Sequence, residues 1–246
     1  MYDLSNINTN FFLESTLNNI EISQKVALVI PWRATPSRIT LFDHLIDWYS
    51  KEFPCFEIIL SDSGHETFNL SASRNMGIKK AFSGGNQVVI CSDSDVFVSK
   101  DSVIKSILSA VDTNNITVPY TELRKISQEG TEKFLNNDSK SFDMTERITE
   151  VPSLTEGEKQ RLSPCAGIII LTDTIFNEFG GFDESYSGWG IEDIDYHKRY
   201  LDKYGRLFDY IDGSLISLYH SRAEWTNPDS RNIDLFKSKY GSNFIF

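Results

Sequence analysis

The sequence lacks the features of several large classes of protein. It has three cysteines among 246 residues, too few for a disulfide framework, and neither a basic start nor a long apolar run stands at its N-terminus. Basic side chains are also scarce, since 24 Lys and Arg face 35 Asp and Glu and the net charge is −11. We therefore expect a cytoplasmic chain with no signal peptide, no membrane anchor and no nucleic-acid partner, whose cysteines are reduced core residues: Cys55, Cys91 and Cys165.

The glycine-rich signatures that cradle nucleotide phosphates are missing as well. Neither G-x-x-x-x-G-K-[ST] nor G-x-G-x-x-G occurs in the chain. The negative charge does not exclude a small anionic ligand, but its phosphates would have to be held by a few local basic groups or by a metal ion. A metal on Asp95 is the simpler solution.

The apolar content that is present indicates a folded α/β protein. Apolar residues make up 40% of the chain and aromatic residues 13%, enough for one substantial core, so we expect a single domain over residues 1–246. Short apolar runs predict strands at residues 25–31, 56–60, 87–97 and 115–119.

Two helices are expected between these strands. The first should be capped by Thr35 and bury a face that runs from Ile39 to Tyr49. The second should begin near Ser71 and end at a pair of glycines. Strand–helix–strand units of this kind predict an open, mostly parallel sheet flanked by helices, with residues 25–119 as its nucleotide-binding half.

The chain from residue 120 onward has a different character. Residues 120–163 are polar, charged and weakly periodic, so we expect a mobile insertion with short helices there. Residues 164–246 should form the second half of the domain, with a strand at 165–171, a helix at 191–204 and a strand at 214–220.

Polar side chains gather at the carboxyl ends of the predicted strands, where open sheets of this kind bind ligands. Asp93 and Asp95 follow one strand and can share a hard cation, and His220, at the end of another, is a candidate third ligand. A mixed carboxylate and imidazole set suits Mn²⁺ better than Ca²⁺. The alternative is structural, because acids are common in turns and a histidine at a strand end more often packs than binds metal.

The segment "SGWGIEDIDYH" combines an indole with acids. Two glycines flank Trp189 and let the backbone approach a ligand closely, and an indole beside carboxylates is a common way to hold a sugar. Glu192 and Asp193 point about 100° apart on a helix, so one can hold a hydroxyl while the other removes its proton. The alternative is that both acids simply favour a helix N-terminus.

The order of these motifs resembles the glycosyltransferases of the GT-A fold, and most closely their β-1,4-galactosyltransferase and chondroitin-synthase-like group. "IPWR" is similar to a turn of that group and "FNLSASRNMG" to the helix that lines its nucleotide pocket. "DSD" resembles its metal-binding acids, "GWGIED" its acceptor motif and "YHSR" the segment with its metal-binding histidine. The resemblance spans roughly residues 26–222 and implies the GT-A (Rossmann-like) fold.

The resemblance also implies a role for each matching residue. The residues that would bind the nucleotide are Pro31, Arg33, Asp62, Arg74, Asp93 and Ser94. Asp95 and His220, with Asp93 beside them, would bind Mn²⁺ or Mg²⁺. The residues that would bind the acceptor sugar are Tyr186, Trp189, Gly190 and Glu192, and Asp193 would be the catalytic base. This chain departs from the family in two places. It has Ile191 where the family often has glycine, and its residues 120–163 have no counterpart in the family.

The implied reaction moves a hexose or N-acetylhexosamine from a UDP-sugar to a hydroxyl of a saccharide or glycoconjugate acceptor, as in polysaccharide biosynthesis. A metal would offset the charge of the leaving diphosphate, and one base with direct displacement would invert the anomeric centre. Three alternatives stay open. These are a retaining transferase of the polypeptide N-acetylgalactosaminyltransferase type, a catalytically inactive sugar-nucleotide-binding module, and an α/β domain of another nucleotide-binding type.

Overall fold

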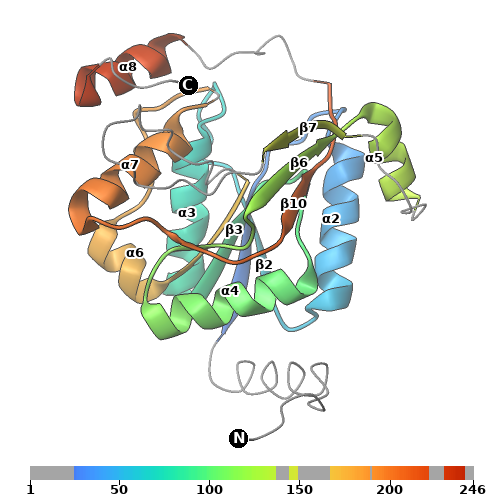
Figure 1. Cartoon of the computed structure of the whole chain (residues 1–246), viewed down its shortest axis with the longest axis horizontal. Helices are drawn as coiled ribbons and strands as arrows, with labels where there is room; N and C mark the ends of the chain where they lie inside the picture. Colours follow the sequence, from blue (N-terminus) through green and yellow to red (C-terminus); the bar gives the residue numbers. More distant parts are fainter. Residues whose placement is uncertain (1–24, 137–143, 149–166, 189, 222–229, 242–246) are drawn as a thin grey trace, which may run out of the picture.

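The computed structural model describes residues 25–136, 144–148, 167–188, 190–221 and 230–241 (Figure 1). One sheet has the order β2-β1-β3-β8-β5-β9, and its strands are β1 (Val26–Pro31), β2 (Glu57–Ser61), β3 (Val88–Ser92), β5 (Thr117–Val118), β8 (Ile168–Thr172) and β9 (Asp209–Tyr210). A smaller sheet has the order β4-β10-β6-β7, with β4 (Val96–Phe97), β6 (Glu122–Ile126), β7 (Met144–Ile148) and β10 (Ser214–Ser217). The helices are α2 (Ile39–Glu52), α3 (Leu70–Ser83), α4 (Lys100–Thr113), α5 (Gln128–Leu135), α6 (Asp173–Phe179), α7 (Glu192–Tyr204) and α8 (Ser230–Tyr240).

The centre of the larger sheet confirms the predicted α/β class. Every residue of β1 is buried, as the continuous apolar run requires, and β1 pairs in parallel with both β2 and β3. The strand β8 then pairs antiparallel with β3. Because parallel strands end at the same edge, the carboxyl ends of β1, β2 and β3 lie side by side.

The helix α3 lies close against this sheet. It begins one residue before the predicted Ser71, after Asn69, whose side-chain oxygen accepts a hydrogen bond from the Ala72 amide at 2.9 Å. A β-carbon added at Gly77 would lie 2.4 Å from Cγ1 of Val29 in β1, so this glycine allows the close approach. That packing sets the position of Arg74 one turn earlier.

The prediction that Thr35 caps the first helix is wrong. Residues 36–38 form a turn, in which the Arg38 amide donates to the Thr35 carbonyl, and α2 begins at Ile39. Ile39 was expected in the buried face but is 44% exposed, because the helix starts later and buries Leu41, Leu45 and Tyr49 instead.

The region 120–163 contains more regular structure than the sequence predicted. The short helix α5 was expected, but the strands β6 and β7 were not. β6 pairs in parallel with β10, and of its five residues only Leu123 and Ile126 are buried, so its pattern alone is weak. Much of the predicted mobile insertion lies outside the described residues.

Two further sequence expectations can be compared with the structure. Cys91 is buried, which raises the pKa of its thiol to about 12, whereas Cys55 is exposed and is not the core residue expected; Cys165 lies outside the described residues. Among the helices described, none is both long and apolar enough to cross a bilayer.

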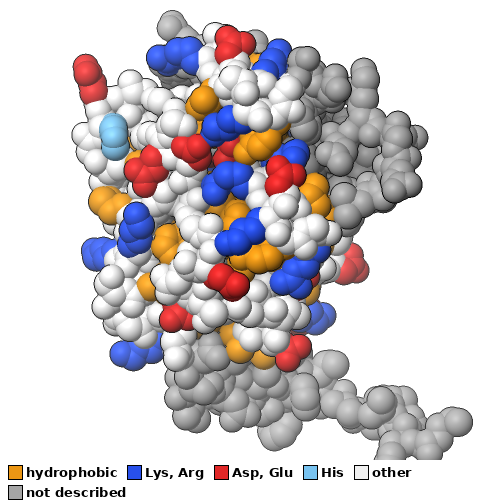
Figure 2. All heavy atoms as spheres, turned by 90° about the vertical axis from the view of Figure 1, so that its left-hand side faces the viewer, with side chains coloured by type: hydrophobic (Ala, Val, Ile, Leu, Met, Phe, Trp, Pro, Cys, Tyr) orange, Lys and Arg blue, Asp and Glu red, His pale blue; other side chains and the backbone are white. Residues whose placement is uncertain are grey.

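The helix α8 packs beside α7 (Figure 1) and encloses a small second core of Tyr186, Ile191 and Phe236. On the face of the molecule that these helices share, basic and acidic side chains are interspersed (Figure 2). A patch of one sign does not dominate the described part of that face.

Candidate active site

Arg33 and Asp62 meet at the carboxyl ends of β1 and β2, as their positions predicted. Nε and Nη2 of Arg33 each donate to one Asp62 oxygen at 2.7 Å. The guanidinium also donates to the carbonyl oxygens of Glu66 and His65 and lies over the Phe68 ring. The hydrogen bond from Arg33 lowers the pKa of Asp62. Pro31 is buried at the end of β1, so the three predicted residues share one corner of the sheet edge.

Asp95 and His220 form a second pair at this edge. The Leu218 amide donates to the Asp95 carbonyl at 2.9 Å, which brings the end of β10 to the turn after β3. Oδ2 of Asp95 then lies 3.0 Å from Nε2 of His220. Burial alone would raise the pKa of Asp95, but the hydrogen bond from His220 and the charge of Arg38 outweigh it and the pKa is lowered.

The contact between Asp95 and His220 is a hydrogen bond, and the same spacing suits two metal ligands once the ring nitrogen has lost its proton. Nη2 of Arg38 also lies 3.0 Å from Nε2 of His220, and a single ring nitrogen cannot satisfy both Arg38 and Asp95. Neighbouring ligands about 2.1 Å from an octahedral ion are about 3 Å apart, which matches the separation of the Asp95 and His220 atoms. The residues therefore fit two positions of a divalent ion.

Asp93 does not complete that set. Its carboxylate accepts a hydrogen bond from Nη2 of Arg74 at 2.8 Å. Within the described part of the chain, no three His, Cys, Asp or Glu side chains cluster as a metal site. The neighbouring Ser94 is buried in the turn. Asp95 and His220 thus form a pair, and any remaining ligands would come from elsewhere.

Arg74 connects the two halves of the site. Its Nη1 donates to Oε1 of Glu192 at 3.1 Å while its Nη2 holds Asp93, and only 6% of its side chain is exposed. The guanidinium lies over the Phe182 ring. Burial lowers the pKa of Arg74, but the charges of Asp93 and Glu192 outweigh this effect and the pKa is raised overall, so the side chain stays a cation. One buried charge therefore fixes the distance between the acids after β3 and those that begin α7.

Glu192 and Asp193 form the first turn of α7, as predicted. Glu192 is 6% exposed, and burial together with the charge of Asp193 raises its pKa to about 7 despite Arg74. Burial also raises the pKa of Asp193, whose Oδ1 accepts a hydrogen bond from the Ile194 amide. Two adjacent carboxyls with raised pKa values are typical of acid–base sites.

The turn into α7 carries unusual backbone geometry. Gly188, Gly190 and Ile191 all have positive φ, and Ile191 has φ 78° at the residue before the helix. This conformation is costly for a β-branched residue. The burial of Ile191, which is 2% exposed, offsets the strain. Trp189 lies outside the described residues.

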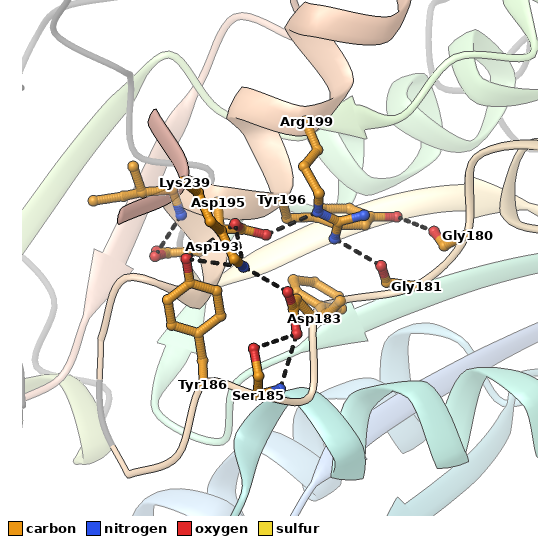
Figure 3. Close-up of polar contacts among 12 residues, drawn as sticks. Gly180, Gly181, Asp183, Ser185, Tyr186, Asp193, Asp195, Tyr196, Arg199 and Lys239 are labelled. Carbon is orange, nitrogen blue, oxygen red and sulfur yellow. Dashed lines mark hydrogen bonds and ion pairs between the residues drawn. The ribbon is translucent and has the colours of Figure 1, made fainter. Parts of the chain in front are cut away.

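Tyr186 takes part in a network around Asp195 (Figure 3). Asp195 is fully buried and accepts hydrogen bonds from Tyr186, Tyr240, Lys239 and Arg199 at 2.8–3.1 Å. Tyr186 is 2% exposed and its hydroxyl donates to Asp195, so in this structure the hydroxyl is used inside the protein. His197 is also buried, with its ring stacked on Phe208.

Comparison with known proteins identifies the family. Residues 55–220 match the model described as glycosyltransferase-like family 2. The chain belongs to this family. No match was found among curated proteins.

Solved glycosyltransferases are similar in structure to this family 2 member. A mutant of Drosophila β-1,4-galactosyltransferase 7, in complex with manganese, UDP-Gal and xylobiose, is 15% identical, with a TM-score of 0.47 over 77% of this chain and 64% of its own. GalNAc-T7 with UDP, GalNAc and Mn²⁺ is 14% identical, with a TM-score of 0.50 over 87% of this chain and 48% of its own. Glucosyl-3-phosphoglycerate synthase from Mycobacterium tuberculosis, with Mn²⁺, UDP-glucose and phosphoglyceric acid, is 15% identical, with a TM-score of 0.45 over 92% of this chain and 82% of its own.

The likeness to GalNAc-T7 supports the predicted GT-A fold for the family 2 chain. This chain spans less than two thirds of the length of the first two proteins, since it covers 64% and 48% of them.

Sequence reasoning missed two polar residues of the family 2 site. Arg38 approaches His220 from the start of α2, and Asn232 contacts the turn before α7 from the distant helix α8. Neither residue lies in a motif. Only Asn232 could have been noticed in the sequence, as a polar residue on the buried face of a helix whose other buried residue is apolar.

Proposed function

We propose that this protein is an inverting, metal-dependent glycosyltransferase that moves a hexose or N-acetylhexosamine from a UDP-sugar to a hydroxyl of a saccharide acceptor. The Arg74 bridge carries the proposal. It holds Asp93, at the strand end where nucleotides bind in this fold, and Glu192, at the start of α7, on one buried cation. Direct transfer requires the donor sugar and the acceptor hydroxyl to be held side by side, and the bridge brings the acids proposed to bind each of them to one guanidinium.

The donor half would use the corner formed by Arg33 and Asp62. Their mutual hydrogen bonds pre-organise the guanidinium and leave about a third of each side chain exposed for the nucleoside, 33% and 34%. Pro31 and Ser94 would line the same pocket. The similar structure of GalNAc-T7 supports a uridine nucleotide, since it holds UDP with Mn²⁺.

Asp95 and His220 would hold the metal. Their donor atoms, 3.0 Å apart, suit an ion that accepts oxygen and nitrogen, and the imidazole favours Mn²⁺ over Mg²⁺. Bound there, the ion would offset the negative charge that develops on the leaving diphosphate. Asp93 and Arg74 would sit beside it and orient the donor.

The acceptor half would use the acids of α7. Asp193 takes the proton of the attacking hydroxyl, because its raised pKa makes it a better base than an exposed aspartate. Glu192, fixed by Arg74, accepts a hydrogen bond from a neighbouring acceptor hydroxyl. The indole of Trp189 supplies a stacking face, and Gly190 lets the backbone come close to the sugar. One base and direct displacement give inversion, as in the β-1,4-galactosyltransferase and chondroitin-synthase-like group that the motifs resemble.

A retaining transferase of the polypeptide N-acetylgalactosaminyltransferase type is the second candidate. The structural likeness to GalNAc-T7 favours it. Asp193 argues against it, since that group usually has asparagine at this position. The anomeric configuration of the product, read by proton NMR, separates the two.

The test begins with donors, because hydrolysis needs no acceptor. UDP- and GDP-sugars are screened for hydrolysis with Mn²⁺ and with EDTA, and UDP and GDP binding is measured by calorimetry under the same conditions. We expect binding and hydrolysis of UDP-sugars that depend on Mn²⁺. Equal binding of UDP in EDTA would remove Asp95 and His220 as metal ligands, and the absence of hydrolysis and transfer with every donor would remove the proposed activity.

A further inference from the structure

The helix α8 lies outside the residues that define the family, yet it contacts the turn into α7. The family match ends at residue 220 and α8 spans Ser230–Tyr240. Lys239 joins it to Asp183 at 2.5 Å and to Asp195 at 3.1 Å (Figure 3). Phe236 of the same helix is fully buried in a cluster with Tyr186 and Ile191. This docking brings one polar residue of α8, Asn232, to the backbone ahead of the catalytic acids.

Asn232 uses both ends of its amide on that backbone. Its Nδ2 donates to the carbonyl oxygens of Ser187 and Gly190, each at 3.0 Å, and its Oδ1 accepts from the Ser187 amide at 3.3 Å. The side chain is buried, with the residue 3% exposed. The asparagine therefore acts as a bracket: it binds both Ser187 and Gly190 and fixes these two ends of the turn relative to each other.

The opposite side of the same turn is held by α3. Gly188 forms a β-bridge with Asn69, and Nδ2 of Asn69 donates to the Glu184 carbonyl at 2.9 Å. The turn is thus fixed from both sides by asparagine residues, one at the start of α3 and one in α8. Gly188 and Gly190 have positive φ, which glycine adopts without strain among several accessible conformations, so the contacts with Asn69 and Asn232 select this one.

We infer that Asn232 is a positioning residue for sugar transfer: by fixing residues 187–190 it sets where α7 begins and so where Asp193 and Glu192 face the acceptor. The inference rests on the proposed function. Loss of the bracket would leave the donor corner and the Asp95–His220 pair in place, because their own hydrogen bonds join the end of β1 to that of β2, and the end of β10 to the turn after β3 and to the residue before α2. Transfer would fall while donor binding stayed the same.

The experiment compares three variants of the full chain. Asn232→Ala removes the bracket. Asn232→Asp keeps the shape of the side chain but replaces the NH₂ group, which donates to two carbonyl oxygens, by an oxygen that can only accept. Leu235→Ala is the control, since it removes packing from the same helix without a side-chain hydrogen bond to the turn. Each is assayed for Mn²⁺–UDP affinity, for hydrolysis of the best UDP-sugar, and for transfer to the p-nitrophenyl glycoside that the wild type uses best.

We expect both Asn232 variants to lose about 10- to 100-fold in transfer kcat, because a displacement of about 1 Å at a reacting group has an effect of this size. Their UDP affinity and donor hydrolysis should stay within about twofold of the wild type. Leu235→Ala should lose thermal stability and keep its ratio of transfer to hydrolysis. The inference would be overturned if the ratio of transfer to hydrolysis fell as much in Leu235→Ala as in the Asn232 variants. It would also be overturned if both Asn232 variants transferred sugar at the wild-type rate.

Hydrogen exchange tests the same inference without any activity. The peptide that covers residues 185–195 should exchange faster in Asn232→Ala than in the wild type and Leu235→Ala. Unchanged protection would refute the bracket even if transfer fell. If the wild type transfers no sugar but the exchange result is as expected, the proposed function fails and the bracket stands.

Discussion

Arg74→Met should destabilise the protein far more than removal of an ordinary surface arginine. The Arg74 side chain is 6% exposed, and its partners Asp93 and Glu192 are 28% and 8% exposed. Methionine fills a similar volume but leaves Glu192 buried beside Asp193 without a cation. Removal of one partner of a buried ion pair typically costs about 3–5 kcal/mol, which for a chain of this length corresponds to a fall in Tm of roughly 6–20 °C.

The cost should depend on pH and on Glu192. The pKa of Glu192 is already raised to about 7, and loss of Arg74, which lowers it, would raise it further. At about pH 5 the carboxyl is then neutral and the substitution should cost less than at about pH 8. In the double variant with Glu192→Gln the buried charge is absent, and part of the lost stability should return, by about 0.5–3 kcal/mol.

Urea unfolding at both pH values measures these free energies. Arg33→Met is the matched control, because its ion pair with Asp62 is about a third exposed on each side, 33% and 34%, and such solvent-exposed pairs contribute little to stability. If Arg74→Met cost as little as Arg33→Met, or if Glu192→Gln recovered nothing, the idea of a buried charge that joins the two halves would be refuted.

Three further predictions concern the reaction and its metal. Asp193→Asn should bind UDP and Mn²⁺ as the wild type does but lose about 10²- to 10⁴-fold in single-turnover transfer. Asp202→Asn, on the same helix and with a side chain that is 50% exposed, is the control and should transfer sugar at the wild-type rate. Normal transfer by Asp193→Asn would exclude Asp193 as the catalytic base. His220→Ala should weaken Mn²⁺ binding in the presence of UDP by roughly 10- to 100-fold, as seen by calorimetry, with an unchanged circular dichroism spectrum. Glu192 has its pKa raised from 4.5 to about 7, so the stability it contributes is present below about pH 4.5 and is lost as the pH rises through about 7; the Glu192→Gln variant should show a smaller fall in unfolding free energy over that range.

Strong local patterns made much of the fold predictable. β1 is a continuous apolar run and lies buried between two parallel neighbours, as such runs do. α7 ends at Gly205, which has φ 64° and is the usual terminator of a helix. β6 was missed because charged residues surround its few buried positions, so neither alternation nor an apolar run marks it.

The candidate site was predictable only where chemistry lies at strand ends. Arg33 and Asp62 could be paired because parallel strands bring their carboxyl ends together. The bond from Arg74 to Glu192 spans 118 residues and joins two helices, and nothing in either segment specifies the other. Isoleucine does not indicate the positive φ of residue 191, and the only signal for it was the glycine that is frequent at this position in the resembled group.

The network around Asp195 bears on where the folding unit ends. Two of its hydrogen-bond donors, Lys239 and Tyr240, come from α8, whereas the family match stops at residue 220. A fragment that ends at residue 222 would keep every motif named above but leave a fully buried carboxylate short of donors and uncover the apolar neighbours of Phe236. The stretch that resembles other glycosyltransferases is therefore shorter than the stretch that must unfold together. A library of domains trimmed to the family boundaries would record this chain as insoluble.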